Sequence, residues 1–144
     1  MLDWAAIIGG LAIGFGISLL AGVLVGVLEV VSYRRETGID VFTADDSEDE
    51  RIFARLREDT TFQVGGLIIS LLSDVLAGYF AAHWADAAPL AHAGIVGALS
   101  VALTWLVDWR DITPPWSMYL WTLLAVPAAL AGAWLEMGMP PLFR

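Results

Sequence analysis

The chain has 144 residues, of which 58% are hydrophobic and 16% are charged, and its formal net charge at pH 7 is −9. Soluble domains carry a larger share of charged residues, so this composition indicates an integral membrane protein. The negative charge argues against nucleic acid as a partner, because binding to phosphates needs a basic patch. The lack of cysteine excludes disulfide bonds and thiolate metal sites.

Four apolar segments are long enough to span a membrane. They cover residues 4–31, 62–84, 89–107 and 114–135. A helix of about 20 residues crosses a hydrocarbon core of roughly 30 Å. We therefore expect an all-α fold, in which residues 1–144 form a single integral membrane domain with four transmembrane helices. The connections at 85–88 and 108–113 are short, which predicts an antiparallel, up-and-down bundle.

The arginines predict how the helices are oriented. Six of the seven basic residues fall in the connections 32–61 and 108–113. Because cytoplasmic loops carry an excess of arginine and lysine, we expect these two connections in the cytoplasm and both termini outside. The chain is thus expected to be a multi-pass protein of the cell membrane, surrounded by the lipid bilayer.

The longer cytoplasmic connection is predicted to contain a short helix. Ser47 followed by Glu50 forms a capping box ahead of residues 48–59. The apolar side of this segment carries Ile52, Phe53 and Leu56. We expect an amphipathic helix that lies on the inner membrane surface, with binding of a partner protein to the same face as the alternative.

In the first two spans, small residues recur at every fourth position. This spacing keeps them on one face of a helix, and small side chains let a second helix approach closely. The expected packing residues, which form a glycine zipper, are Gly10, Gly14, Ser18, Gly22, Gly26, Gly66 and Gly78. We expect these faces to serve packing within the chain and assembly with a second copy or with another membrane protein.

Asp74 lies at the middle of the second span. An acid at this depth costs about 3 kcal/mol on insertion scales and needs a partner inside the bundle. No arginine lies at matching depth and the chain has no lysine, so we expect Asp74 to be protonated at neutral pH. The expected neighbours are Ser18, Ser70 and Ser100. Two roles are open for Asp74: a proton or cation site, or a neutral hydrogen-bonded acid that holds the helices in register.

Three residues of metal-ligand type, His83, Asp86 and His92, lie near the expected outer ends of the second and third spans. Such residues beside a short turn favour capping roles, and we expect no metal site and no cofactor. The sequence contains no HExxH motif, phosphate-binding loop or GxSxG motif. We therefore expect a protein without enzyme activity.

Residues 77–79 (Ala-Gly-Tyr) and 97–100 (Gly-Ala-Leu-Ser) form a pattern in the second and third spans. In this pattern the chain resembles small uncharacterised prokaryotic four-helix membrane proteins, a domain-of-unknown-function type. The resemblance implies a fold and no activity. Separately, a glycine-striped helix followed by a helix with a mid-membrane acid is similar to the proteolipid hairpin of rotary ATPases, which has a shorter loop and lacks the two further helices.

Two functions remain open from the sequence. The first is a non-enzymatic membrane protein whose small-residue faces serve packing and assembly. The second is a proton- or cation-coupled transporter or channel subunit that uses Asp74.

Overall fold

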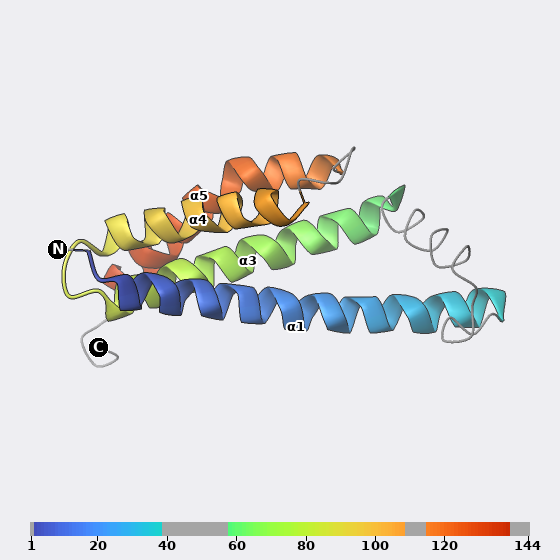
Figure 1. Cartoon of the computed structure of the whole chain (residues 1–144). Helices are drawn as coiled ribbons and strands as arrows, with labels where there is room; N and C mark the ends of the chain where they lie inside the picture. The colour runs from blue at the N-terminus through green and yellow to red at the C-terminus, as the bar shows by residue number, and fades with distance from the viewer. Residues whose placement is uncertain (1, 39–57, 109–114, 139–144) are drawn as a thin grey trace.

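The computed structural model describes residues 2–38, 58–108 and 115–138. Within these residues the regular structure is helical and consists of α1 (Trp4–Thr37), α3 (Thr60–Trp84), α4 (Pro89–Asp108) and α5 (Trp116–Gly138) (Figure 1). Each of these helices is long and apolar enough to cross a membrane. The predictions of an all-α fold and of four candidate membrane spans are therefore confirmed.

Acidic side chains cap the starts of α1 and α3. The Asp3 carboxylate accepts a hydrogen bond from the Ala5 backbone N–H at 2.9 Å, and the Asp59 carboxylate accepts one from the Thr61 N–H at 2.7 Å. The first N–H groups of a helix have no partner within the helix, and the negative charge also suits the helix dipole. Because Asp59 is the cap, α3 begins at Thr60 rather than at residue 62 as predicted.

The first helix is longer than its predicted span of 4–31, because it continues to Thr37. Gly38 ends it in the left-handed conformation, with φ of 73°, and its N–H donates to the Arg34 carbonyl at 2.9 Å. Arg34 and Arg35 lie in the last turn, where positive charge is favourable. Residues 32–37 of the predicted loop are thus helical.

The predicted surface helix at 48–59 lies outside the described residues, apart from Glu58 and Asp59. The connection at 109–114 also lies outside them. The last span was expected from residue 114, but α5 begins at Trp116 and ends at Gly138.

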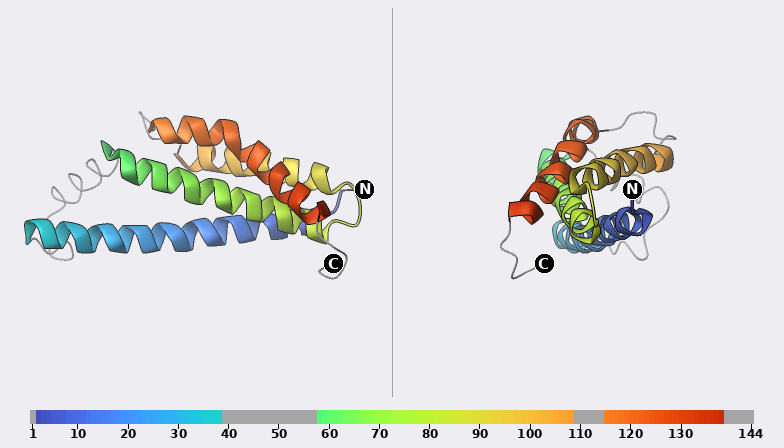
Figure 2. Two further views of the ribbon diagram at one scale, coloured as in Figure 1. Left: turned by 180° about the vertical axis from the view of Figure 1, so that it is seen from behind. Right: turned by 90° about the vertical axis from the view of Figure 1, so that its left-hand side faces the viewer.

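The ends of the four helices gather at two ends of the molecule (Figures 1 and 2). The start of α1, the connection 85–88 and the end of α5 lie together, and we call this the turn end. The start of α3, the end of α4 and the start of α5 lie toward the opposite end, which we call the loop end. At the loop end α1 extends beyond the other helices (Figure 1).

The buried core runs from the middle of the bundle to the turn end and is built mainly of alanine. The buried alanines are Ala6, Ala77, Ala81, Ala82, Ala93, Ala125, Ala129 and Ala133. Helices in a membrane associate through van der Waals packing, for which small side chains permit close approach. The composition of this core thus explains how four helices fit closely together at the turn end.

The closest helix crossing joins α3 and α5. A Cβ atom added at Gly78 would overlap the Ala129 carbonyl oxygen, and one added at Gly132 would overlap the Val75 carbonyl oxygen. The two backbones therefore touch from both sides, and neither position has room for a side chain. α5 also contains Pro127 and bends along its length (Figure 2). Proline removes a backbone hydrogen bond and bends helices, which directs the second half of α5 across α3.

At the turn end, two glycines of the predicted stripe on α1 face α3. A Cβ at Gly10 would lie 2.7 Å from the Ala77 carbonyl oxygen, and one at Gly14 would lie 2.9 Å from the Ala77 Cβ. Real Cβ atoms rarely come this close to other atoms, so α1 approaches α3 here because these residues are glycine.

Toward the loop end the predicted stripe has no close neighbour. No described atom outside the adjacent backbone of the same helix lies within 4 Å of a Cβ added at Gly22, Gly26 or Gly66. The close contacts expected at these three positions are therefore not formed within the described chain. The physical reason is that α1 and α3 diverge toward the loop end (Figure 1).

Candidate functional site

A cavity of about 400 Å³ lies between the helices on the loop-end side of the core. All four described helices contribute to it. Its polar lining consists of Ser18, Gln63, Ser70, Asp74, Ser100, Thr104 and Ser117. Its aromatic lining consists of Phe15, Phe62 and Trp121. The cavity therefore extends from the middle of α3, at Asp74, to the first turns of α3 and α5.

Asp74 joins three helices at the inner end of this cavity. Its side chain is buried, with 6% of the residue exposed. The Trp121 indole N–H of α5 donates a hydrogen bond to Asp74 Oδ2 at 2.7 Å, and the Ser100 hydroxyl of α4 hydrogen-bonds the same carboxyl group. A buried polar group without such partners would be strongly unfavourable, so these two contacts account for the tolerance of an acid at this depth.

The four residues that the sequence suggested for a proton or cation site line this one cavity. Asp74 and Ser70 come from α3, Ser18 from α1 and Ser100 from α4. Ser73, next to Asp74, is buried outside the cavity lining, and its hydroxyl donates to the Ile69 carbonyl of its own helix at 2.9 Å. With Ser117 from α5, the cavity combines one acid with hydroxyl groups from four helices.

Sequence reasoning did not find Trp121, which donates a hydrogen bond to Asp74. A signal for it exists, because Trp121 precedes the buried Ala125, Ala129 and Ala133 at a spacing of four. This spacing places Trp121 on the buried face of α5 rather than at the membrane interface. A tryptophan on that face needs a hydrogen-bond acceptor for its indole N–H, and Asp74 supplies it.

Gln63, Thr104 and Ser117 were also not singled out from the sequence. Gln63 precedes Ser70 and Asp74 at helical spacings of seven and eleven, and Thr104 follows Ser100 by four. Each of these pairs falls on one helix face, so a search for polar residues that share a face with Asp74 or Ser100 would have identified Gln63 and Thr104. Ser117 precedes Trp121 by four and is found only once Trp121 is known.

Asp74 is the one titratable side chain among the described residues that line the cavity. The other polar groups are hydroxyls and the Gln63 amide, which carry no charge. The charge of the lining is therefore set by the protonation of Asp74 alone. Such a lining favours a proton or a cation over an anion.

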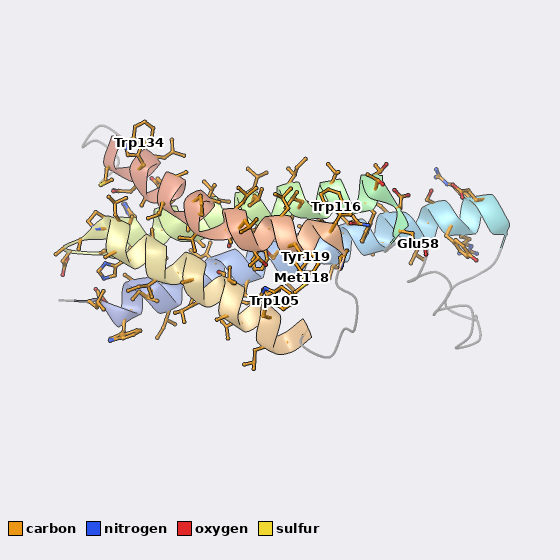
Figure 3. The ribbon with its side chains drawn as sticks, turned by 90° about the horizontal axis from the view of Figure 1, so that it is seen from above. Glu58, Trp105, Trp116, Met118, Tyr119 and Trp134 are labelled. Carbon is orange, nitrogen blue, oxygen red and sulfur yellow. The ribbon has the colours of Figure 1, made fainter. Side chains whose placement is uncertain are left out.

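Beside the cavity, α4 and α5 are tied together by side chains. The Trp105 indole N–H donates to the Thr122 hydroxyl at 2.9 Å, and this hydroxyl donates to the Met118 carbonyl at 2.8 Å. The rings of Trp105 and Tyr119 lie 6.0 Å apart (Figure 3). Trp105 and Tyr119 are therefore packed against each other near the loop end, where Met118 also lines the cavity.

At the turn end, His92 links α4 to the start of α1. His92 is fully buried, and its Nε2 accepts a hydrogen bond from the Asp3 backbone N–H at 2.7 Å. Its Nδ1 lies 3.0 Å from the Ala88 carbonyl oxygen. Nε2 must be unprotonated to accept, and Nδ1 must carry the proton to donate. Both ring nitrogens are thus engaged, so His92 fastens α1 to α4.

His83 pairs with an acid that the sequence did not point out. Its Nδ1 lies 3.5 Å from the buried Glu136 carboxylate of α5, and its ring stacks on that of Tyr79. Asp86 is exposed in the connection that follows. Within residues 2–38, 58–108 and 115–138, no group of three histidine, aspartate or glutamate side chains is arranged to hold a metal ion. His83 and His92 therefore serve different contacts rather than one site.

Each of the two stretches that carry the sequence resemblance has a glycine that faces α5. Gly78 contacts Ala129, and a Cβ at Gly97 would lie 2.9 Å from the Val126 Cα. Comparisons with protein-family models, with curated proteins and with solved structures find no match for this chain. The resemblance stays a prediction that rests on these residues.

Proposed function

We propose that this chain is a multi-pass membrane protein that binds a proton or a cation at Asp74, as a small transporter or channel subunit. The observation that carries this proposal is the cavity, whose one titratable lining residue is an acid at the middle of a span. An acid that only held helices together would need its hydrogen-bond partners but no cavity. Asp74 has both.

The chemistry of Asp74 leaves capacity for a further partner. A carboxylate has about four acceptor positions, and the Trp121 N–H and the Ser100 hydroxyl use two of them. Ser18 and Ser70 line the same cavity and add hydroxyl oxygens. A proton or a cation at Asp74 would therefore be stabilised by groups that the fold already holds in place.

The proposal includes an orientation. The helices run antiparallel, the loop end faces the cytoplasm, and the turn end and both termini face outward. The arginine-rich connections support this orientation through the positive-inside rule. The alanine core separates Asp74 from the turn end, whereas the cavity extends toward the loop end. Asp74 would thus be reached from the cytoplasm in this conformation.

The test is proton and cation flux into vesicles that contain the purified chain. A potassium diffusion potential drives the flux, a pH-sensitive dye in the vesicle lumen reports proton entry, and a sodium-sensitive dye reports cation entry. We expect Asp74→Asn to reduce the flux to the level of empty vesicles, because an amide cannot exchange a proton or pair with a cation. The amide oxygen can still accept from Trp121, so folding should be retained.

Ser73→Ala is the matched control, because Ser73 is the buried neighbour of Asp74 and lies outside the cavity lining. It should leave the flux unchanged. Equal fluxes for the wild type and Asp74→Asn, both above empty vesicles, would overturn the role of Asp74.

A second function, assembly through α1, is favoured by a different observation. Large apolar side chains, including Leu20, Leu24 and Leu28, are exposed along the loop-end half of α1. Lipid alone accounts for such leucines, but glycine in a helix costs about 1 kcal/mol relative to alanine. Gly22 and Gly26 have open space around them, so a second copy of the chain or another membrane helix would account for their presence.

Light scattering in detergent would measure this assembly. We expect Gly22→Leu to lower the mass of the particle, because the added side chain blocks close approach. Gly16→Leu is the control, since Gly16 also faces open space but lies off the stripe. A particle of one chain in the wild type, or equal effects of both changes, would argue against assembly through this stripe.

A further inference from the structure

The size of the cavity bears on what it holds. A proton occupies no volume of its own, and a dehydrated metal ion is held by several oxygen atoms at about 2.0–2.6 Å in a tight cage. Pockets of roughly 300–1,000 Å³ hold molecules. The cavity beside Asp74 has a volume of about 400 Å³ and falls within that range. Its volume therefore points to a molecule rather than to a bare ion.

The charge of the lining selects the kind of molecule. No arginine or lysine is among the described residues that line the cavity, and Asp74 is the one acid. In a site of low dielectric, an ionised carboxylate attracts a cation strongly and repels an anion. The occupant that matches this lining carries a single positive charge.

The aromatic residues select the chemistry of that charge. Phe15 from α1, Phe62 from α3 and Trp121 from α5 all line the cavity. The faces of aromatic rings attract organic cations, and rings from several directions are the usual surroundings of quaternary ammonium groups. Metal ions are instead bound by oxygen atoms in a tight shell. Trp121 hydrogen-bonds Asp74, and Phe15 follows Gly14, which lies against Ser73 and Ala77, so these two rings are at the Asp74 end of the cavity. Phe62 is twelve residues before Asp74 on α3 and lies at the opposite end.

We propose that this cavity binds a small organic cation with a quaternary ammonium group, which pairs with Asp74 and contacts Phe15 and Trp121. This inference rests on the proposed function of Asp74 and names its substrate class. When Asp74 is protonated, binding of the cation displaces the proton from the carboxyl group to the water in the cavity. The carboxylate that remains then balances the charge of the ammonium group, so cation and proton compete for one site.

Choline chloride is a suitable probe, titrated by calorimetry into the full chain in phosphatidylglycerol nanodiscs. Its uncharged analogue, in which a carbon atom replaces the nitrogen, has the same shape, and sodium chloride supplies the charge without the organic group. We expect choline to bind at least about tenfold more tightly than either, because only choline makes both the ion pair and the aromatic contacts. Equal binding of choline and the uncharged analogue would overturn the inference.

Variants separate the two contacts. Asp74→Asn should weaken choline binding at least about tenfold, and Phe15→Leu should weaken it roughly threefold to thirtyfold. Phe80→Leu is the matched control, because Phe80 packs against Tyr79 and Trp84 instead of lining the cavity. It should leave binding unchanged. If Phe15→Leu and Asp74→Asn both bind choline like the wild type, the inference is wrong.

The pH dependence gives an independent readout. Asp74 is the titratable group among the described lining residues from α1, α3, α4 and α5, so choline should bind more weakly as the pH falls. Asp74→Asn should remove this dependence. A nanodisc with added phosphatidylcholine distinguishes two sources of the cation, since a lipid headgroup in the cavity would lower the apparent affinity for free choline. Affinity for choline that is independent of pH in the wild type would contradict the proposal.

The failure of this inference differs from the failure of the proposed function. If Asp74→Asn abolishes flux in vesicles but choline does not bind, the site handles protons or inorganic cations and the organic-cation inference is overturned. If choline binds in the expected way but Asp74→Asn leaves flux unchanged, the cavity is a binding site and transport through Asp74 is overturned.

Discussion

The turn-end half of the bundle is filled with side chains, whereas the loop-end half contains the cavity. In the filled half, Gly10, Gly78 and Gly132 lie against backbone atoms of a neighbouring helix. In the open half, Gly22 and Gly66 have the same helical spacing but no described atom close to them. A spacing of four residues therefore places small residues on one face of a helix. Whether a second helix packs against that face depends on whether the two helices stay close or diverge.

Asp74 lies at the border between these halves. Toward the turn end follow Ala77 and Gly78, which are buried against other helices, and toward the loop end lies Ser70, which lines the cavity. The filled half holds the helices that position Trp121 and Ser100 around the acid, and the open half gives access to it. The same helices therefore form a packed half that holds Asp74 in place and an open half through which Asp74 is reached.

The largest expected effect tests this division on α3. Gly78→Leu should lower the free energy of unfolding by about 3 kcal/mol or more, because the Ala129 backbone cannot move away from the new side chain. Gly66→Leu, on the same helix, should change it by less than about 0.5 kcal/mol. Because Gly66 lines the cavity, its replacement should instead reduce the binding of a cation. Thermal unfolding in detergent, together with calorimetric titration, measures both; equal destabilisation would mean that the loop-end half is packed after all.

A medium effect is expected at the border itself. Trp121→Phe keeps an aromatic ring in the cavity but removes the N–H that donates to Asp74. Loss of one hydrogen bond to a buried carboxyl group should lower the free energy of unfolding by about 2 kcal/mol. Thr122→Val is a suitable comparison, since it removes the more exposed hydrogen bond from Trp105 and should cost about 1 kcal/mol. If Trp121→Phe were as stable as the wild type, the contact with Asp74 would contribute nothing to the fold.

The positions of the four spans could be predicted because apolar length is a property of each segment alone. The end of α1 was missed, since the prediction followed hydrophobicity and stopped at residue 31, whereas Arg34, Arg35 and Gly38 carry the helix-end signal. The divergence of α1 from α3 could not be predicted from the sequence, because the small residues have the same spacing at both ends of α1. That geometry depends on contacts between helices rather than on the sequence of one.

The candidate site could be predicted in part. Depth along the spans was enough to suggest Ser18, Ser70 and Ser100 as neighbours of Asp74, and these residues line the same cavity. Depth does not identify which helix face meets which, so Trp121 was missed even though it hydrogen-bonds Asp74 at 2.7 Å. The size of the cavity could not be predicted from the sequence either, since it results from the divergence of the helices on the loop-end side of the alanine core.

The smallest expected effect is that of glycine-to-alanine changes on α1, which should alter the free energy of unfolding in opposite directions at Gly10 and at Gly22. Gly10→Ala adds a methyl group 2.7 Å from the Ala77 carbonyl oxygen and should lower the free energy of unfolding by about 1–2 kcal/mol. In a detergent particle that holds a single chain, Gly22→Ala adds the same group to open space and should raise it by about 1 kcal/mol through helix propensity. Thermal unfolding of the two variants in the same detergent compares them directly. If Gly22→Ala also destabilised the protein, the second half of α1 would be packed against another chain in the detergent particle, because a single chain offers no described atom for the new methyl group to meet.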